Sequence, residues 1–168
     1  MVLVVNSIGA YYMKISTKSE YGLRAMIDLA LEFDKGHVLL RDISEKQDIS
    51  FKYLGQLFLL LKNSGLIKGQ RGAKGGYSLN RNPKDITLLE IFESLEGPLS
   101  LTQCDTNDSC CSKTKSCVTH DIWKTTKEMI YDFFKGITLE KLVKMHKEKI
   151  KSPCQNNSDE IYKCEGKI

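Results

Sequence analysis

Residues 48–65 of the chain have the sequence DISFKYLGQLFLLLKNSG, which is the most informative segment for its architecture. Its large apolar residues recur at the three- and four-residue spacing of one helical face: Leu54, Leu57, Phe58 and Leu61. This spacing predicts a helix over residues 51–63 with one buried side. The hydroxyl of Ser50 can cap the start of that helix, and Gly65 supplies a left-handed stop at its end.

Shorter helices are predicted on the N-terminal side of this stretch. Residues 41–47 predict a helix that reaches the next one through a tight connection at Asp48, Ile49 and Ser50. Residues 19–33 predict an amphipathic helix whose buried face is formed by Leu23, Met26, Ile27, Ala30 and Leu31. Two helices joined by a tight turn, with polar side chains facing outward, are typical of a helix-turn-helix.

Two short strands, residues 66–68 and 77–79, are predicted after this unit, joined by the glycine-rich residues 69–76. A hairpin in this position is a wing. The net charge of the chain is only +4, but residues 51–84 contain seven basic and no acidic residues. Such segregation predicts a surface for phosphate, and together with the wing it disfavours an ordinary small helical protein.

The helix that begins at Phe51 can enter a major groove. Its first residues would then reach phosphates or base edges: Ser50, Phe51, Lys52, Tyr53 and Gln56. Glutamine suits adenine, and lysine suits phosphate or guanine. In the wing, we expect Arg71 to enter a minor groove and Lys74 to contact phosphate.

The second half of the chain predicts three further helices. Thr87-Leu88-Leu89-Glu90 fits a capping box, and Gly97-Pro98 ends the helix that follows it. Residues 120–135 carry more apolar surface than a solvated helix needs, which predicts pairing with a second copy of the chain. Thr138 can cap a last helix that reaches about residue 149.

The predicted fold class is mainly α with a small β-hairpin wing: a winged helix-turn-helix plus a long dimerisation helix. The expected domains are a disordered extension (1–12), a DNA-binding domain (13–97), a cysteine-rich loop (98–120), a dimerisation helix with a C-terminal helix (121–150), and a disordered tail (151–168). Met13 is a candidate translation start.

Whether the cysteines form disulfides depends on the compartment in which the protein lies. No apolar run approaches the roughly 20 residues of a membrane span, and residues 1–12 lack the basic start of a signal peptide. We therefore expect a cytoplasmic protein, whose thiols stay reduced. Four of the six cysteines lie between Cys104 and Cys117, which favours metal or redox chemistry over disulfides.

Residues 69–76 fit no phosphate or dinucleotide loop, so no enzyme is predicted.

Two stretches, ISFKYLGQLF (49–58) and GLIKGQRGAKGGY (65–77), resemble the IscR-type regulators. The resemblance begins at Met13 and persists to about Lys149. It implies a dimeric winged-helix repressor or activator that binds double-stranded DNA at an imperfect palindrome. One departure is Gly55, which stands where the family has a glutamate; the change weakens helix propensity and removes an acidic group facing DNA.

Residues 104–120 are polar apart from their cysteines and Val118, so these thiols do not look like core packing. Three thiolates and an imidazole can complete a [2Fe–2S] site, and the same donors could hold zinc. The candidate ligands are Cys104, Cys110, Cys111, Cys117 and His120. The family resemblance favours iron, because its members space three cysteines by five residues and end as Cys117 and His120 do.

The middle ligand stays open between Cys110 and Cys111. The gap from Cys104 to Cys110 and the gap from Cys111 to Cys117 both have the expected length, but no single middle cysteine satisfies both. The resemblance implies a cluster-sensing regulator, with repression of iron–sulfur assembly genes as the expected role. The alternatives are a cluster-free regulator of cysteine and sulfur metabolism, or a zinc or cluster protein acting through protein contacts. Cys154 and Cys164 match no motif.

Overall fold

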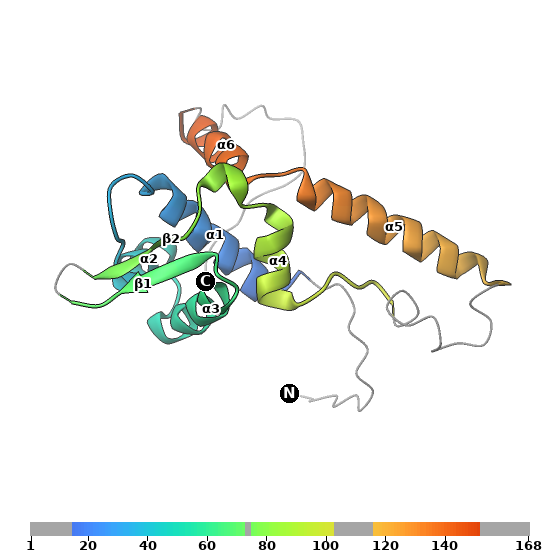
Figure 1. Cartoon of the computed structure of the whole chain (residues 1–168), viewed down its shortest axis with the longest axis horizontal. Coiled ribbons are helices and arrows are strands. Elements are labelled where there is room, and N and C mark those ends of the chain that lie inside the picture. Colours follow the sequence, from blue (N-terminus) through green and yellow to red (C-terminus); the bar gives the residue numbers. More distant parts are fainter. Residues whose placement is uncertain (1–14, 73–74, 103–115, 152–168) are drawn as a thin grey trace, which may run out of the picture.

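The computed structural model describes residues 15–72, 75–102 and 116–151 (Figure 1). It confirms a mainly helical chain with a two-stranded antiparallel hairpin. The elements in chain order are α1 (Thr17–Leu31), α2 (Leu40–Gln47), α3 (Phe51–Asn63), β1 (Ile67–Gln70), β2 (Gly76–Leu79), the 3-10 helix η1 (Pro83–Asp85), α4 (Leu88–Glu96), α5 (Val118–Lys135) and α6 (Leu139–Lys151). The predicted extension at residues 1–12 and the tail from residue 152 lie outside the described residues.

The helix-turn-helix has the predicted caps. The Ser50 hydroxyl accepts a hydrogen bond from the Tyr53 amide at 3.3 Å, and Gly65 has a φ of 75° just beyond the end of α3. The turn between α2 and α3 is tight because Asp48 is left-handed, with a φ of 53°. The Ser44 hydroxyl then donates to the Ile49 carbonyl at 2.6 Å. The predicted buried face of α3 is confirmed in full: Leu54, Leu57, Phe58 and Leu61.

Helix α1 is more enclosed than its sequence pattern predicts. Its most deeply buried apolar side chains are Ala25, Met26 and Leu29, of which only Met26 was predicted to face the core. The other predicted core residues are half-buried: Leu23, Ile27, Ala30 and Leu31. The reason is that α1 packs against α2, α3, α4, α6 and β2. A helix surrounded on several sides has no single buried face for a periodicity argument to find.

The wing hairpin is longer than predicted and is anchored by a third segment. Its strands pair from Ile67 with Leu79 to Gln70 with Gly76. Val38, in the loop after α1, exchanges two backbone hydrogen bonds with Tyr77 at 2.9 and 2.8 Å. Gly76 has a φ of 146°, and a Cβ there would lie 2.6 Å from the Val38 carbonyl oxygen. This close approach therefore requires a glycine.

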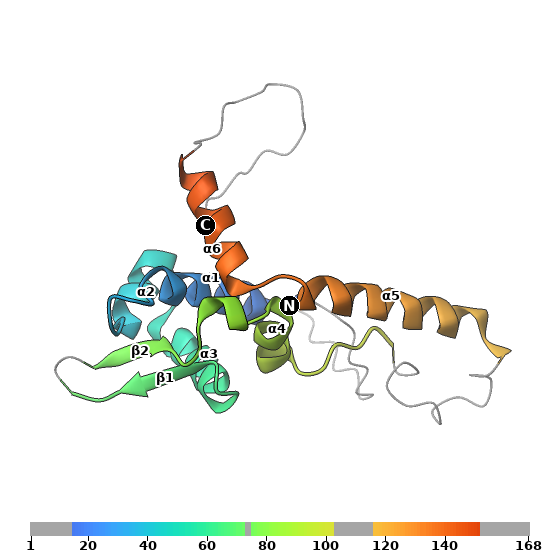
Figure 2. The ribbon, with the colours of Figure 1, turned by 45° about the horizontal axis from the view of Figure 1, so that its top comes forward.

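The C-terminal half places one helix on the core and extends another away from it. Backbone bonds join Leu88 to Ile137 and Leu139 to Ile86, each at 2.8 Å, so α6 begins against the entry to α4. Both views show α5 leaving the body as an arm (Figures 1 and 2). Near its end, Phe134 packs edge-on against Phe92 of α4 at 5.4 Å. Among the described residues, no helix is long and apolar enough to cross a membrane.

Candidate DNA interface and cysteine segment

The start of α3 presents four of its five predicted DNA-contacting residues to solvent: Ser50, Phe51, Lys52 and Gln56. Tyr53 differs because it is half-buried. Its ring stands edge-on to Tyr21 at 6.2 Å, and its hydroxyl lies 3.4 Å from the hydroxyl of Thr17. Tyr53 therefore packs the start of α3 against α1, and only part of its side chain is accessible to a ligand.

The wing projects beside α3, which contacts β1 (Figure 2). Arg71 is exposed directly after β1, and the Gly75 amide donates to the Gly72 carbonyl at 2.9 Å. Lys74 lies outside the described residues. Arg71 thus places an exposed guanidinium just beyond β1, where a groove could receive it.

One basic residue of the segment from Phe51 to Lys84, Arg81, is paired with other residues of the protein. Arg81 bonds to the Glu90 carboxylate at 2.6 Å and to the Asp85 carbonyl at 3.2 Å. Arg81 therefore binds Glu90 of the capping box that begins α4. Within the described residues of this segment, the other basic side chains are exposed and available for phosphate: Lys52, Lys62, Lys68, Arg71 and Lys84.

Helix α3 also exposes apolar side chains that the sequence analysis did not single out. Leu59 and Leu60 are exposed on the side away from the core, in addition to Phe51. A signal was present in the sequence, because both leucines fall between the positions of the buried stripe. They make the outer surface of α3 partly apolar.

Cys117 is the cysteine within the described residues, and it occupies the N-cap position of α5. Its sulfur lies 3.0 Å from the Thr119 hydroxyl. That hydrogen bond, followed by one from the His120 backbone amide, lowers the pKa of the Cys117 thiol below its ordinary value. A lowered pKa favours the thiolate, which is the form that binds metals.

His120 lies in the first turn of α5, where its amide donates to the Cys117 carbonyl at 3.1 Å. Its Nδ1 is 3.3 Å from the Asp121 carboxylate, a contact that favours the tautomer with its proton on Nδ1. Cys104, Cys110 and Cys111 lie outside the described residues. Within the described part, no three potential ligands come together at one point. Cys117 and His120 do fit half of a cluster or zinc site in their chemistry.

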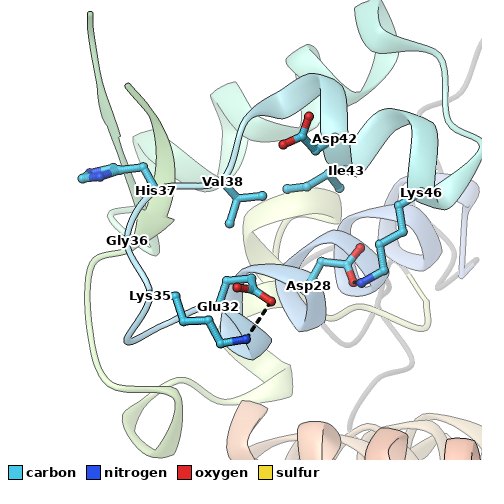
Figure 3. Close-up of a pocket in the computed structure, with 9 residues that line it drawn as sticks. All are labelled: Asp28, Glu32, Lys35, Gly36, His37, Val38, Asp42, Ile43 and Lys46. Carbon is cyan, nitrogen blue, oxygen red and sulfur yellow. Dashed lines mark hydrogen bonds and ion pairs between the residues drawn. The ribbon is translucent and has the colours of Figure 1, made fainter. Parts of the chain in front are cut away.

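A cavity of about 300 Å³ lies between the end of α1, the loop after it and α2 (Figure 3). Asp28 in its wall is bound by Lys46 and by Gln47, each at 2.6 Å. Lys35 pairs with Glu32 at 3.2 Å across another part of the lining. These charged side chains of the lining pair with one another. We therefore interpret the cavity as a consequence of how α2 packs against α1.

Comparison with known proteins agrees with this architecture. The Rrf2 family profile, described as an iron-dependent transcriptional regulator, matches residues 15–145. The HTH-type transcriptional regulator IscR of Pectobacterium atrosepticum is 35% identical over 156 residues, which cover 93% of this chain and 94% of that protein.

Two solved structures are similar over most of the chain. T. potens IscR has a TM-score of 0.66 and 39% identity, covering 81% of this chain and 90% of its own. CymR, the global cysteine regulator of B. subtilis, has a TM-score of 0.66 and 34% identity, covering 79% and 98%. These similar proteins are regulators rather than enzymes.

Proposed function

Because this chain belongs to the Rrf2 family of transcriptional regulators, we propose that it binds promoter DNA as a homodimer and adjusts that binding through a [2Fe–2S] cluster. The proposed action is repression of genes for iron–sulfur cluster assembly, in the cytoplasm. Likeness to proteins named IscR supports this choice of target. The family assignment also makes the chain a regulator and not an enzyme.

The observation that carries DNA binding is the exposed start of α3 beside the wing. Lys52 and Gln56 face outward on α3, and Arg71 stands at the end of the hairpin. The sequence from Phe51 to Lys84 contains seven basic and no acidic residues. A helix start, a wing and a basic segment together suit a major groove, the adjacent minor groove and the phosphates between them.

The apolar stripe along α5 supports a homodimer. No residue of this 18-residue helix is buried. Val118, Ile122, Met129 and Phe133 lie at spacings of four, seven and four residues, close to the seam of a helix pair, and Met129 and Phe133 are 69% and 63% exposed. A second copy offers the same stripe, so two α5 helices can cover each other and set two α3 helices at successive major grooves.

The residues proposed to hold the cluster are Cys104, Cys117, His120 and one of Cys110 and Cys111. When bound, the cluster would supply one-electron chemistry that responds to oxidants. The lowered pKa of Cys117 favours a ready thiolate, and the Asp121 carboxylate orients His120. Residues 97–117, which include these cysteines, join α4 to α5, so ligation would link the DNA-binding domain to the start of the dimer helix. The same donors also suit zinc.

The test is to purify the full chain without oxygen and to measure its visible spectrum, iron and sulfide. We expect about two irons and two sulfides per chain. Cys117→Ala should lose them, whereas Cys154→Ala, a matched change outside the segment, should keep them. Cys110→Ala and Cys111→Ala compared side by side identify the middle ligand. Duplex binding by the same samples tests DNA recognition independently of the cluster.

A second function is favoured by the likeness to the global cysteine regulator CymR. A colourless protein that stays colourless after reconstitution, yet binds promoter duplexes, would support a cluster-free regulator of cysteine and sulfur metabolism. A protein that binds iron or zinc but no duplex would indicate action through protein contacts instead.

A further inference from the structure

The outer surface of α3 carries large apolar side chains, which phosphate binding does not explain. Phe51 is 57% exposed and Leu59 is 58% exposed. Neither is needed for the core, because the opposite face of the same helix already fills it with Leu54, Leu57, Phe58 and Leu61. Large apolar side chains left in water on a short helix favour a partner that covers them.

The two side chains belong to one row of the helix surface. Residues 51, 55 and 59 are four apart, so they follow one another along the helix. The middle position is Gly55, and a Cβ built there would have one atom within 4 Å, Leu40 Cδ2 at 3.8 Å. The row is therefore apolar at both ends and open in the middle. Lys52 and Gln56 form the adjacent row and are also exposed.

The charge around this row indicates which partner covers it. Lys52 borders it, Lys62 lies beyond its end, and the nearest acidic residues along the chain are Asp48 and Asp85. A surface that is apolar and framed by positive charge suits a polyanion that carries apolar groups of its own. The major groove of DNA is such a partner, because each thymine presents a 5-methyl group between the phosphate backbones.

We propose that Phe51 and Leu59 pack against thymine 5-methyl groups in the major groove, and that Gly55 leaves room for the base edges to approach α3. This inference rests on the proposed DNA binding and names what α3 reads. Gln56, in the adjacent row, suits adenine, whose partner base carries the methyl group. The helix then selects A·T pairs by apolar contact as well as by hydrogen bonding.

The test separates the methyl group from every other feature of the base. The full-length protein first selects duplexes from a random library, and the selected duplex is remade with deoxyuridine in place of one thymine at a time. Deoxyuridine keeps the hydrogen-bonding groups of thymine and lacks its methyl. At the contacted positions we expect binding to weaken about fourfold, the factor that corresponds to about 0.8 kcal/mol per buried methyl group.

Variants assign the effect to residues. Phe51→Ala should bind the thymine and deoxyuridine duplexes equally at one position, and Leu59→Ala should do so at another. Lys52→Ala should weaken binding to both duplexes and keep their ratio, since it removes a phosphate or guanine contact. Thermal unfolding of each variant checks that the fold is intact.

Several results would overturn the inference. Equal binding of every deoxyuridine duplex and its parent by the wild-type protein is one such result, and retention of the discrimination by Phe51→Ala is another. A change in the oligomeric state of Phe51→Ala without DNA would show that the row covers a second copy of the chain. Failure to select any duplex would overturn the proposed DNA binding itself, and that outcome is distinct from selection without methyl discrimination.

Discussion

The ammonium group of Lys46 on α2 lies 2.6 Å from the carboxylate of Asp28 on α1, and Asp28 is only 3% exposed. Gln47 donates to the same carboxylate at 2.6 Å. These two bonds hold the first helix of the helix-turn-helix against the helix behind it. Figure 3 shows the side chain of Lys46 beside Asp28. Since α2 packs against α3, the position of the helix proposed to read DNA depends on this contact.

Lys46→Met should lower the free energy of unfolding by about 1 to 2 kcal/mol, because it removes a hydrogen bond to a buried charged group. Lys35→Met is the matched control. Lys35 pairs with Glu32 where both side chains are exposed, and such a pair contributes about 0.5 kcal/mol or less. Urea denaturation of the two variants measures the difference, and equal effects would contradict a special role for Asp28.

Gly55→Ala should raise the free energy of unfolding by about 1 kcal/mol, because alanine is the better helix former and the site has room for a Cβ. Gly22→Ala should do the opposite. Its Cβ would lie 2.4 Å from Leu95 Cδ1, where α1 meets α4, and overpacking of that kind costs about 1 to 3 kcal/mol. Thermal unfolding compares the two; a destabilised Gly55→Ala would mean that α3 needs the glycine for its own structure.

The stability contributed by Glu96 should disappear in acid. Burial alone would raise the pKa of this carboxyl, but hydrogen bonds from Ser16, Ser19 and Lys18 outweigh it and lower the pKa below the ordinary 4.5. A lowered folded-state pKa stabilises the protein above 4.5, and this contribution is lost as the pH falls through the folded value. Glu96→Gln should therefore be less stable than wild type at neutral pH, and the difference should shrink as the pH falls below 4.5. Unfolding titrations at several pH values measure this, and a gap that widened in acid would refute it.

Met129→Asp should convert the proposed homodimer to a monomer. The substitution introduces a charge in the middle of the exposed stripe of α5, and an unpaired charge is expensive to bury in an interface. Lys124→Asp, on the same helix but off the stripe, should leave the dimer intact. Sedimentation velocity at matched concentrations distinguishes the two states. A Met129→Asp protein that remains dimeric would place the interface elsewhere.

Arg71→Ala should weaken operator binding by about tenfold or more, as expected when an arginine that contacts bases is removed. Arg81→Ala is the matched control, because Arg81 is paired with Glu90 and should matter for stability rather than for DNA. Binding isotherms at two salt concentrations check both variants. Equal losses of affinity would show that the wing contributes only general positive charge.

Much of the local structure followed from the sequence. The Ser50 cap, the Thr87 and Glu90 capping box and the stop at Gly65 were predictable, because each depends on residues within one turn of the chain. The buried stripe of α3 was predictable for a related reason. One side of that helix meets the core, and a single buried side leaves a clear period in the sequence.

Contacts between distant segments were decided by the tertiary structure alone. The backbone pairing of Val38 with Tyr77 and the ion pair of Arg81 with Glu90 cannot be recognised in the sequence, because each joins residues on different elements. Periodicity likewise misjudged α1, because a helix enclosed by several neighbours hides more than one face. Local patterns were enough to predict which segments become helices, where they begin and end, and where positive charge gathers. Which side chains pack inside and which remain exposed for a partner followed from the three-dimensional arrangement, because burial depends on neighbours that are remote along the chain.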